Sequence, residues 1–358
     1  MKSNKRDFWL TVIVLAVFAV LVVLVQTGVV TLVDSYQIHV LNLCAIYTIL
    51  GLSMNLVNGF TGLFSLGQAG FMAIGAYVTA LLIMEPDVKE RVFYVEPIEP
   101  WLGSLQCPFW LALLAGGLLA AVVAFFIGFP VLRLRGDYLA IVTLAFGEII
   151  RNVINCLYIS LDGQRLHIAF NNPNVAGKLL VNGPAGATGV NKMATFGMGF
   201  ALTLFTLFVV LNLIDSRSGR AIMAIRDNRI AAEAMGLNVT KYKMMAFVTS
   251  AVLAGMAGAL YGLNFSTVAA SKFKFDTSIL VLVFVVLGGI GNIRGSIISA
   301  TLLTILPELL RAFANYRMLI YAIVLILVML ATNNPTLRGM VERIIPRGKG
   351  RKKEADEA

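Results

Sequence analysis

Long apolar segments without charge dominate the hydrophobic pattern of this chain. The uncharged runs cover residues 8–33, 35–84, 100–132, 193–214, 244–271 and 318–337. A helix needs about 20 residues to cross a hydrocarbon layer of roughly 30 Å, so each run can span a membrane and the second can cross it twice. The runs do not alternate polar and apolar residues, as the strands of a membrane barrel do. Because backbone amides in lipid must bond within the segment, the pattern predicts transmembrane helices.

These runs predict an all-α integral membrane protein, a polytopic bundle of about ten transmembrane helices. The spans are expected near residues 8–30, 36–57, 62–84, 109–129, 137–158, 193–214, 244–264, 277–291, 296–310 and 318–332. The first span is longer than a signal-peptide core and no cleavage site follows it, so we expect it to be retained. The pieces at 277–291 and 296–310 are short, and as a re-entrant pair they would leave eight crossings. Residues 1–332 would form the transmembrane domain and residues 333–358 a basic tail.

The distribution of positive charge predicts the orientation in the membrane. Lys and Arg concentrate in the N-terminus, in the segments 130–136 and 215–243, and after residue 332. Cytoplasmic loops accumulate these residues, so we expect both termini in the cytoplasm. The net charge of +10 is then mainly an orientation signal, with contacts to anionic lipid head groups, and we expect no nucleic-acid partner.

One ionisable pair lies inside a predicted span. Glu148 and Arg151 are three residues apart, so they share a face of the helix predicted to begin near Asp137. At about 1.5 Å per residue, Glu148 lies roughly 16 Å along this helix, near the middle of the bilayer. A charge at that depth is costly unless it is paired or hydrated. The pair therefore either lines a transport pathway or fixes helix packing, and both interpretations stay open.

Two Gly-rich stretches interrupt the apolar pattern, near residues 58–70 and 288–296. They contain the sequences NGFTGLFSLGQAG and LGGIGNIRGS. Irregular backbone at membrane depth is tolerated where protein covers it or where it lines a cavity. We therefore expect broken helices at both places. The candidate residues are Gly67, Gly70, Gly288, Gly289, Gly291 and Arg294.

Small residues recur at every fourth position in one predicted span. They are Ser250, Ala254, Gly258 and Gly262. Helices in lipid associate where small residues let two backbones approach closely. This face therefore predicts tight contact with another helix.

One charged segment stands out in a chain that is 58% hydrophobic and 13% charged. It is RAIMAIRDNRIAAEAMGLNVTKYK, residues 220–243. Treated as one cytoplasmic helix over residues 220–237, it carries an apolar stripe formed by Met223, Ile230, Ala234 and Leu237. Gly236 is placed to end this helix. A helix lying on lipid would be expected to present bulky Phe, Trp or Leu, so the thin stripe favours docking of a protein partner.

Three stretches of the chain carry a family resemblance in combination. They are AIRDNRIAAEAMGLNVTKYK, GLSMNLVNGFTGLFSLGQAGFMAIGAY and LRGDYLAIVTLAFGEIIRN. Together they resemble the LivM-type permeases of branched-chain amino acid ABC transporters, from about Tyr47 to about Leu310. The resemblance implies a bacterial inner-membrane subunit that forms half of a pathway for leucine, isoleucine or valine. It also implies as partners a LivH-type second permease, two cytoplasmic ATPases and a periplasmic substrate-binding protein.

The same resemblance implies an ATPase-coupling helix in the charged segment. In ABC permeases, a cytoplasmic segment with Glu-Ala-Ala and a later Gly couples ATP binding to helix motion. Gly236 follows Glu233 by three positions, where the general pattern has six, so this chain departs from that pattern. The residues that would belong to the coupling helix are Arg220, Arg226, Asp227, Arg229, Glu233, Ala234 and Gly236.

Catalytic chemistry is not expected in this chain. It lacks Gly-x-x-x-x-Gly-Lys-Ser/Thr, so we expect ATP to be used by the partner subunits and no cofactor to be bound here. With His39 and His167 as the histidines and no metal-ligand spacing among the three cysteines, we expect neither an enzyme nor a metal site. Two alternatives stay open. One is an importer of the same class for urea, short amides or aromatic acids, and the other is an ion-coupled secondary transporter with Glu148 as its ion site.

Overall fold

A computed structural model describes most of the apolar part of the chain. The described residues are 35–92, 106–134, 136–162, 165–170, 178–182, 186–188, 194–265, 267–313, 316 and 319–326. The predicted first span near 8–30 and the tail at 333–358 lie outside these residues, as does part of the last span near 318–332. The total of ten crossings therefore stays a prediction.

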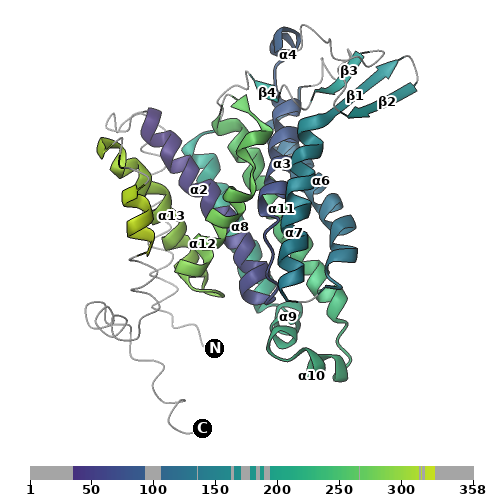
Figure 1. Cartoon of the computed structure of the whole chain (residues 1–358), viewed down its shortest axis with the longest axis vertical. Coiled ribbons are helices and arrows are strands. Elements are labelled where there is room, and N and C mark those ends of the chain that lie inside the picture. Colours follow the sequence, from purple (N-terminus) through teal and green to yellow (C-terminus); the bar gives the residue numbers. More distant parts are fainter. Residues whose placement is uncertain are drawn as a thin grey trace. The chain divides into compact units, whose positions relative to one another are not determined.

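Helices form most of the described chain (Figure 1). The long ones are α2 (Ser35–Asn55), α6 (Phe109–Val131), α7 (Asp137–Cys156), α8 (Phe196–Asp215) and α11 (Val239–Asn264). The shorter ones are α3 (Gln68–Ile83), α4 (Pro86–Val92), α9 (Arg217–Asp227), α10 (Arg229–Ala234), α12 (Phe275–Gly288) and α13 (Ile293–Leu309), with the π-helical turn η1 (Leu56–Phe60) and the 3-10 turns η2 (Ala270–Lys272) and η3 (Leu310–Phe313). Within the described residues, five segments are long and apolar enough to cross a membrane, α2 with η1 counting as one. The predicted class of helical membrane protein is therefore confirmed.

The chain divides into two compact units, and the first ends at Thr304. The first unit contains every helix from α2 to α12 and α13 as far as Thr304. The second contains the end of α13 and the turn η3. All contacts described below lie within the first unit.

Small residues bring α3 and α11 into backbone contact. A Cβ atom on Gly258 of α11 would overlap the carbonyl oxygen of Met72 on α3. One on Gly75 of α3 would overlap the carbonyl oxygen of Gly255 on α11. Any side chain at these positions would separate the helices, so the close contact predicted from the four-residue spacing in α11 is confirmed.

Large apolar side chains cover the outer faces of α6 and α8. Leu118 and Phe126 of α6 are 69% and 71% exposed, and Phe208 of α8 is 63% exposed. A soluble monomer rarely exposes large apolar patches, because each costs free energy in water. Such faces are suited to contact with lipid chains.

Both predicted helix interruptions are present. α2 continues into η1, and residues 61–67 are not helical, so α3 begins at Gln68 instead of near residue 62. The second break separates α12 from α13, where Gly289 and Gly291 have φ angles of +91° and +79°. Glycine adopts this left-handed region without the steric cost that other residues incur.

A small antiparallel sheet follows α7, and the apolar pattern did not predict it. β1 (Leu157–Asp162) lies between β2 (Arg165–Phe170) and β3 (Lys178–Asn182). A second pair joins β4 (Ala187–Thr188) to β5 (Thr267–Val268). A search for long apolar runs does not detect strands of five or six residues, which explains the difference. Figure 1 shows the three-stranded sheet and helices α9 and α10 at opposite ends of the helical bundle.

The charged segment forms two helices, so the predicted single helix over residues 220–237 is wrong. The break falls at Asn228, whose backbone is extended with φ −151° and ψ 102°. Its side chain accepts a hydrogen bond from Ala231 N at 3.1 Å and caps α10. Ser216 and Asn238 cap α9 and α11 in the same way. The predicted apolar stripe fails with the single helix, because the turn reorients every residue after it. We refer to α9, Asn228 and α10 as the α9–α10 elbow.

Candidate functional site

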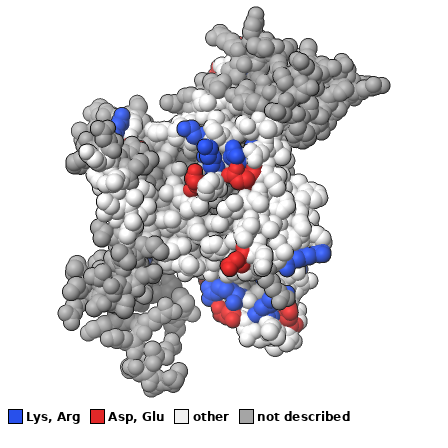
Figure 2. Space-filling view, viewed as in Figure 1, with Lys and Arg blue, Asp and Glu red and all other residues white. Residues whose placement is uncertain are grey.

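Helix α10 presents large apolar side chains between charged ones. Ile230 and Met235 are 80% and 82% exposed, and Gly236 is exposed beside them. On the same helix, Arg229 Nε donates to Glu233 Oε1 at 2.8 Å. Figure 2 shows Lys, Arg, Asp and Glu gathered over the elbow at the bottom of the view. Two exposed large apolar side chains, one on this short helix and one at its C-cap, indicate a surface for a binding partner.

The buried side of the elbow fixes it to α11. Ile225 of α9, Ala232 of α10 and Val239 of α11 form a buried cluster, with Leu237 and Tyr242 packed against it. Because the cluster joins three helices, a displacement of α10 acts on α9 and α11 as well. Leu237 belongs to the stripe predicted for a single helix, whereas Ile225, Ala232 and Val239 do not.

Gly236 ends α10, as predicted. Its φ angle is +82°. Its N–H donates to the Glu233 carbonyl at 3.0 Å, and Leu237 N–H donates to the Ala232 carbonyl at 3.1 Å. This pair of bonds is typical of a helix that ends at a glycine. A Cβ atom here would meet nothing within 4 Å, so a larger residue would cause backbone strain without a clash.

Arg226, at the end of α9, reaches the end of the membrane helix formed by α2 and η1. Its Nη1 donates to the Gly59 carbonyl at 3.1 Å. Its Nε and Nη2 donate to Asp227 Oδ1 at 3.0 and 2.9 Å. The aliphatic part of the side chain passes Gly62, where a Cβ atom would lie 2.7 Å from Arg226 Cγ. The elbow therefore contacts the first helix interruption directly.

The two helix interruptions also contact each other. Asn55, at the end of α2, accepts a hydrogen bond from Gly291 N at 2.8 Å and donates to Ser296 Oγ at 3.0 Å. A Cβ atom on Gly59 would overlap Asn55 Oδ1 and lie 2.5 Å from Gly291 N. We call Asn55, Gly59, Gly291 and Ser296 the Asn55 junction. The apolar pattern did not single out Asn55 or Ser296, although an Asn inside an apolar span is itself a signal of interhelical hydrogen bonding.

Gly67 and Gly70 allow the start of α3 to pack against α7. A Cβ atom on Gly67 would lie 2.9 Å from the Thr143 carbonyl oxygen, and one on Gly70 would lie 3.0 Å from Gly147 Cα. Leu66 N–H donates to Thr143 Oγ1 at 3.0 Å. Gly67 and the start of α3 are therefore covered by protein, one of the two conditions under which irregular backbone is tolerated.

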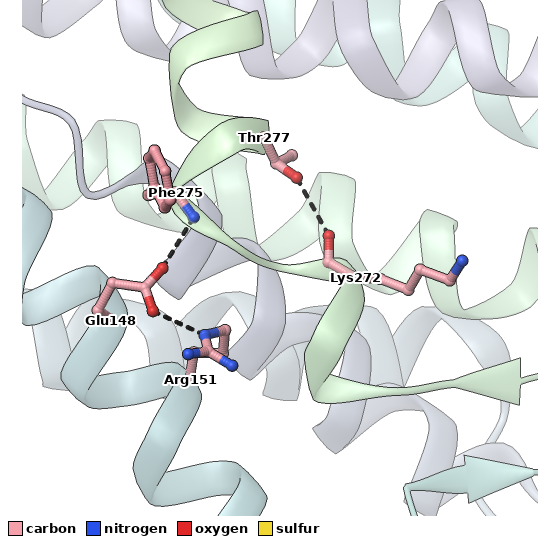
Figure 3. A network of polar contacts seen from close by, with 5 residues as sticks. All are labelled: Glu148, Arg151, Lys272, Phe275 and Thr277. Atoms are coloured by element: carbon pink, nitrogen blue, oxygen red, sulfur yellow. Dashed lines mark hydrogen bonds and ion pairs between the residues drawn. The ribbon is translucent and has the colours of Figure 1, made fainter.

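Glu148 and Arg151 form an ion pair that also holds the start of α12. Arg151 Nε donates to Glu148 Oε2 at 2.8 Å, and Phe275 N–H donates to Glu148 Oε1 at 2.8 Å. The side chains of Arg151 and Glu148 are 20% and 25% exposed. Figure 3 shows the carboxylate between Arg151 and Phe275, with the Lys272 ammonium group directed away from it. A carboxylate at a helix N-terminus accepts an otherwise unpaired N–H and interacts favourably with the helix dipole.

The remaining candidate residues lie at the α12–α13 turn and on α9. A Cβ atom on Gly288 would overlap the backbone of α13, so the two helices touch there. Gly289 ends α12, and Arg294 is exposed on the first turn of α13. Arg220 Nη1 donates at 3.0 Å to the carbonyl five residues earlier in the chain. Over the ranges that the structure describes, no three His, Cys, Asp or Glu side chains are grouped to hold a metal ion.

Spanning helices, helix interruptions and a polar elbow bound to them are together typical of a membrane permease. The sequence comparisons identify the family. The chain belongs to the family described as branched-chain amino acid transport system / permease component, whose profile matches residues 36–329.

Several relatives of the chain are named as permeases of branched-chain amino acid transport systems. The LivM protein of Salmonella typhimurium (strain LT2) is 35% identical over 333 residues, which cover 84% of this chain and 69% of that protein. LivM of Escherichia coli (strain K12) shows the same identity and coverage. LivH of Escherichia coli (strain K12) is 27% identical over 319 residues, covering 83% of this chain and 93% of LivH. The comparison with solved structures found no match.

Proposed function

We propose that this chain is a permease subunit of an ATP-driven importer of branched-chain amino acids and forms half of its translocation pathway. The proposal is supported by 35% identity over most of the chain to two proteins named "High-affinity branched-chain amino acid transport system permease protein LivM". The spanning helices with lipid-suited faces agree with a multi-pass protein of the bacterial inner membrane. Similarity also extends to LivH proteins, so we infer that a LivH-type permease forms the other half.

The observation that carries the energy-coupling part is the surface of α10. Ile230 and Met235 project from a short helix beside the Arg229–Glu233 pair. The surface is too small and too charged for a lipid anchor but suits a cleft on a folded protein. The sequence contains no Gly-x-x-x-x-Gly-Lys-Ser/Thr motif, so the docked partner is expected to be an ATPase.

This assignment has consequences for orientation and for the remaining partners. The elbow must lie in the cytoplasm, where the clustered Lys and Arg of residues 215–243 also predict it to lie. Both termini would then be cytoplasmic. The opposite end, with β1–β3, would face the periplasmic binding protein that delivers the substrate.

An ion-coupled transporter with Glu148 as its ion site has less support. Both Glu148 oxygens already accept hydrogen bonds, one from Arg151 and one from Phe275 N–H. An ion-binding carboxylate would have to release these partners in every cycle. The other alternative, an importer of the same class for urea, short amides or aromatic acids, differs from the proposal only in its substrate. Uptake assays with these compounds distinguish the two.

Reconstitution tests the proposal directly. The chain is purified with its LivH-type permease and two ATPases, placed in liposomes and supplied with the binding protein. We expect leucine, isoleucine or valine uptake that requires both ATP and the binding protein. Uptake of urea or phenylalanine in place of leucine would identify the alternative substrate class. Leucine uptake without nucleotide would contradict the proposal.

Met235→Asp tests the docking surface itself. Because Met235 is 82% exposed, the substitution should leave the fold intact and place a charge in the apolar contact. We expect the ATPases to co-purify about tenfold more weakly, which corresponds to about 1.4 kcal/mol, and Glu233→Lys should act in the same direction. Thr240→Asp, at an exposed site at the start of α11, is the matched control. Wild-type recovery of the ATPases with Met235→Asp would show that they dock elsewhere.

A further inference from the structure

Arg226, on α9, caps the membrane helix formed by α2 and η1, which is distant from it in the sequence. The last carbonyl groups of any helix lack partners within that helix. At the end of α2 and η1, the Gly59 carbonyl accepts a hydrogen bond from Arg226 Nη1 at 3.1 Å, across 167 residues of sequence. A cation at this position also interacts favourably with the negative end of the helix dipole. The cap of this membrane helix is thus part of the α9–α10 elbow.

Two glycines lie next to the Arg226 side chain, one beside its aliphatic part and one beside its guanidinium group. Gly62, with φ +66°, lies against the Arg226 side chain, and a Cβ atom there would be 2.7 Å from Arg226 Cγ. On the other side, a Cβ atom on Gly291 would lie 3.8 Å from Arg226 Nη1, an ordinary contact. Gly62 follows α2 and Gly291 precedes α13. Arg226 therefore lies where the two helix interruptions meet.

The Asn55 junction extends this contact to α13. Asn55 is 1% exposed, and its amide uses both groups, accepting from Gly291 N and donating to Ser296 Oγ. A buried amide with both groups engaged holds its partners in one register, because moving either leaves a polar group unpaired. The elbow, the end of α2 and the α12–α13 turn are thereby linked in series.

We propose that Arg226 is a positioning residue that makes the elbow and the α12–α13 turn move as one body, so that ATPase movement reaches the pathway through Gly59 and the Asn55 junction. The inference rests on the proposed function, because the movement comes from docked ATPases. The rigid guanidinium fork donates to Gly59 and Asp227 at once. The ammonium group of lysine has the same charge but is compact, so it cannot bind the Gly59 carbonyl and the Asp227 carboxylate together in this geometry.

The coupling ratio in the complete reconstituted complex tests the role of Arg226. Arg226→Gln and Arg226→Lys are compared with Arg217→Gln, an exposed residue at the first position of the same helix. We expect both Arg226 variants to assemble with the ATPases at wild-type yield and to hydrolyse ATP. Leucine taken up per ATP hydrolysed should fall about tenfold or more with Arg226→Gln and less with Arg226→Lys, within the range of typical coupling energies. Arg217→Gln should match the wild type.

Two outcomes would overturn the proposal. An unchanged ratio of uptake to hydrolysis in Arg226→Gln would show that the contact does not transmit movement. Loss of ATPase co-purification would place Arg226 in the docking surface instead. Failure of the proposed function would give a different result from failure of this proposal. The wild-type complex itself would then show no ATP-dependent leucine uptake.

A distance measurement tests whether the elbow and the α12–α13 turn move together, without depending on the substrate. Spin labels are placed at Ala231, exposed on α10, and Ile290, 60% exposed at the α12–α13 turn, after the three cysteines are replaced by serine. In the wild-type complex we expect the same distance without nucleotide and with ATP. In Arg226→Gln the two distances should differ. A wild-type distance that changes with ATP as much as the variant's would overturn the proposal.

Discussion

The two ends of α12 are held by different means. At its start, the carboxylate of Glu148, from α7, accepts the Phe275 N–H at 2.8 Å. At its end, the glycine turn lies against the end of α2, where Asn55 accepts the Gly291 N–H. A flexible side chain tolerates small displacements of the helix it caps, whereas touching backbones do not. The start of α12 is thus suited to act as a pivot and its end as a rigid connection.

The need for both partners follows from the length of α12. Its 14 residues extend about 21 Å, which is shorter than the roughly 30 Å hydrocarbon layer. A helix of this length cannot place both of its ends at the two surfaces of the layer, and free N–H groups at a helix start need partners in the protein. Glu148 accepts the Phe275 N–H at the start of α12, and Asn55 accepts the Gly291 N–H in the turn that follows its end.

Gly59→Ala should have the largest effect, because it breaks the rigid end. The added methyl group would overlap Asn55 Oδ1 and lie 2.5 Å from Gly291 N. Inserting a group against backbone that cannot yield costs about 1–3 kcal/mol or more. We expect most leucine uptake to be lost and the melting temperature of the purified complex to fall.

Gly147→Ala on α7 is the matched control for this substitution. Its added methyl group would meet Gly67 Cα at 3.5 Å, an ordinary contact. We expect uptake close to wild type. If Gly59→Ala transports as well as Gly147→Ala, the end of α12 is not a rigid connection and the comparison fails.

A double-mutant cycle on Asn55 and Ser296 measures the polar part of the rigid end. Asn55→Ala leaves the part-buried Gly291 N–H without its acceptor, at a cost of about 1 kcal/mol, the lower end of the range for a buried group. Ser296→Ala removes one bond and should cost less. Since the residues are in contact, their effects on thermal unfolding should be non-additive by about 0.5–3 kcal/mol. Additive losses would show that the hydrogen bond between them contributes nothing.

Glu148→Gln should have a smaller effect on stability than the changes at the end of α12, because glutamine keeps an oxygen for the Phe275 N–H. The lost charge at the helix N-terminus is worth about 0.3–1 kcal/mol. If this end is a pivot, uptake should fall more than the yield of assembled complex. Arg151→Gln should be milder still, because Glu148 still caps α12. A larger effect of Arg151→Gln would make the ion pair, and not the cap, the main role of the site.

The apolar pattern predicted the described spanning helices to within a few residues where the chain is regular. The span expected at 109–129 is α6, Phe109–Val131. A long apolar run in lipid has no alternative to the helix, so its position follows from composition. The pattern did not predict the secondary structure at two places. One is the Asn228 cap inside the charged segment, and the other is the group of short strands after α7.

The contacts of the candidate residues could not be predicted in this way. Gly236 was placed correctly, because a helix-ending glycine is a local feature. Glu148 and Arg151 were paired correctly, since three residues separate them on one helix. The Phe275 N–H on Glu148 and the Gly59 carbonyl on Arg226 join positions 127 and 167 residues apart.

The amino-acid sequence alone established a helical membrane protein, the places where its helices break, and a charged segment that stands outside the lipid. Only the tertiary structure decided that the breaks near residues 58–70 and 288–296 lie against each other. It also decided that Arg226 donates a hydrogen bond to Gly59 at the first of them. The reason is physical. Burial in lipid acts on each residue by itself and leaves a periodic record along the chain, whereas a hydrogen bond between distant segments depends on how whole helices pack, and no local pattern records that.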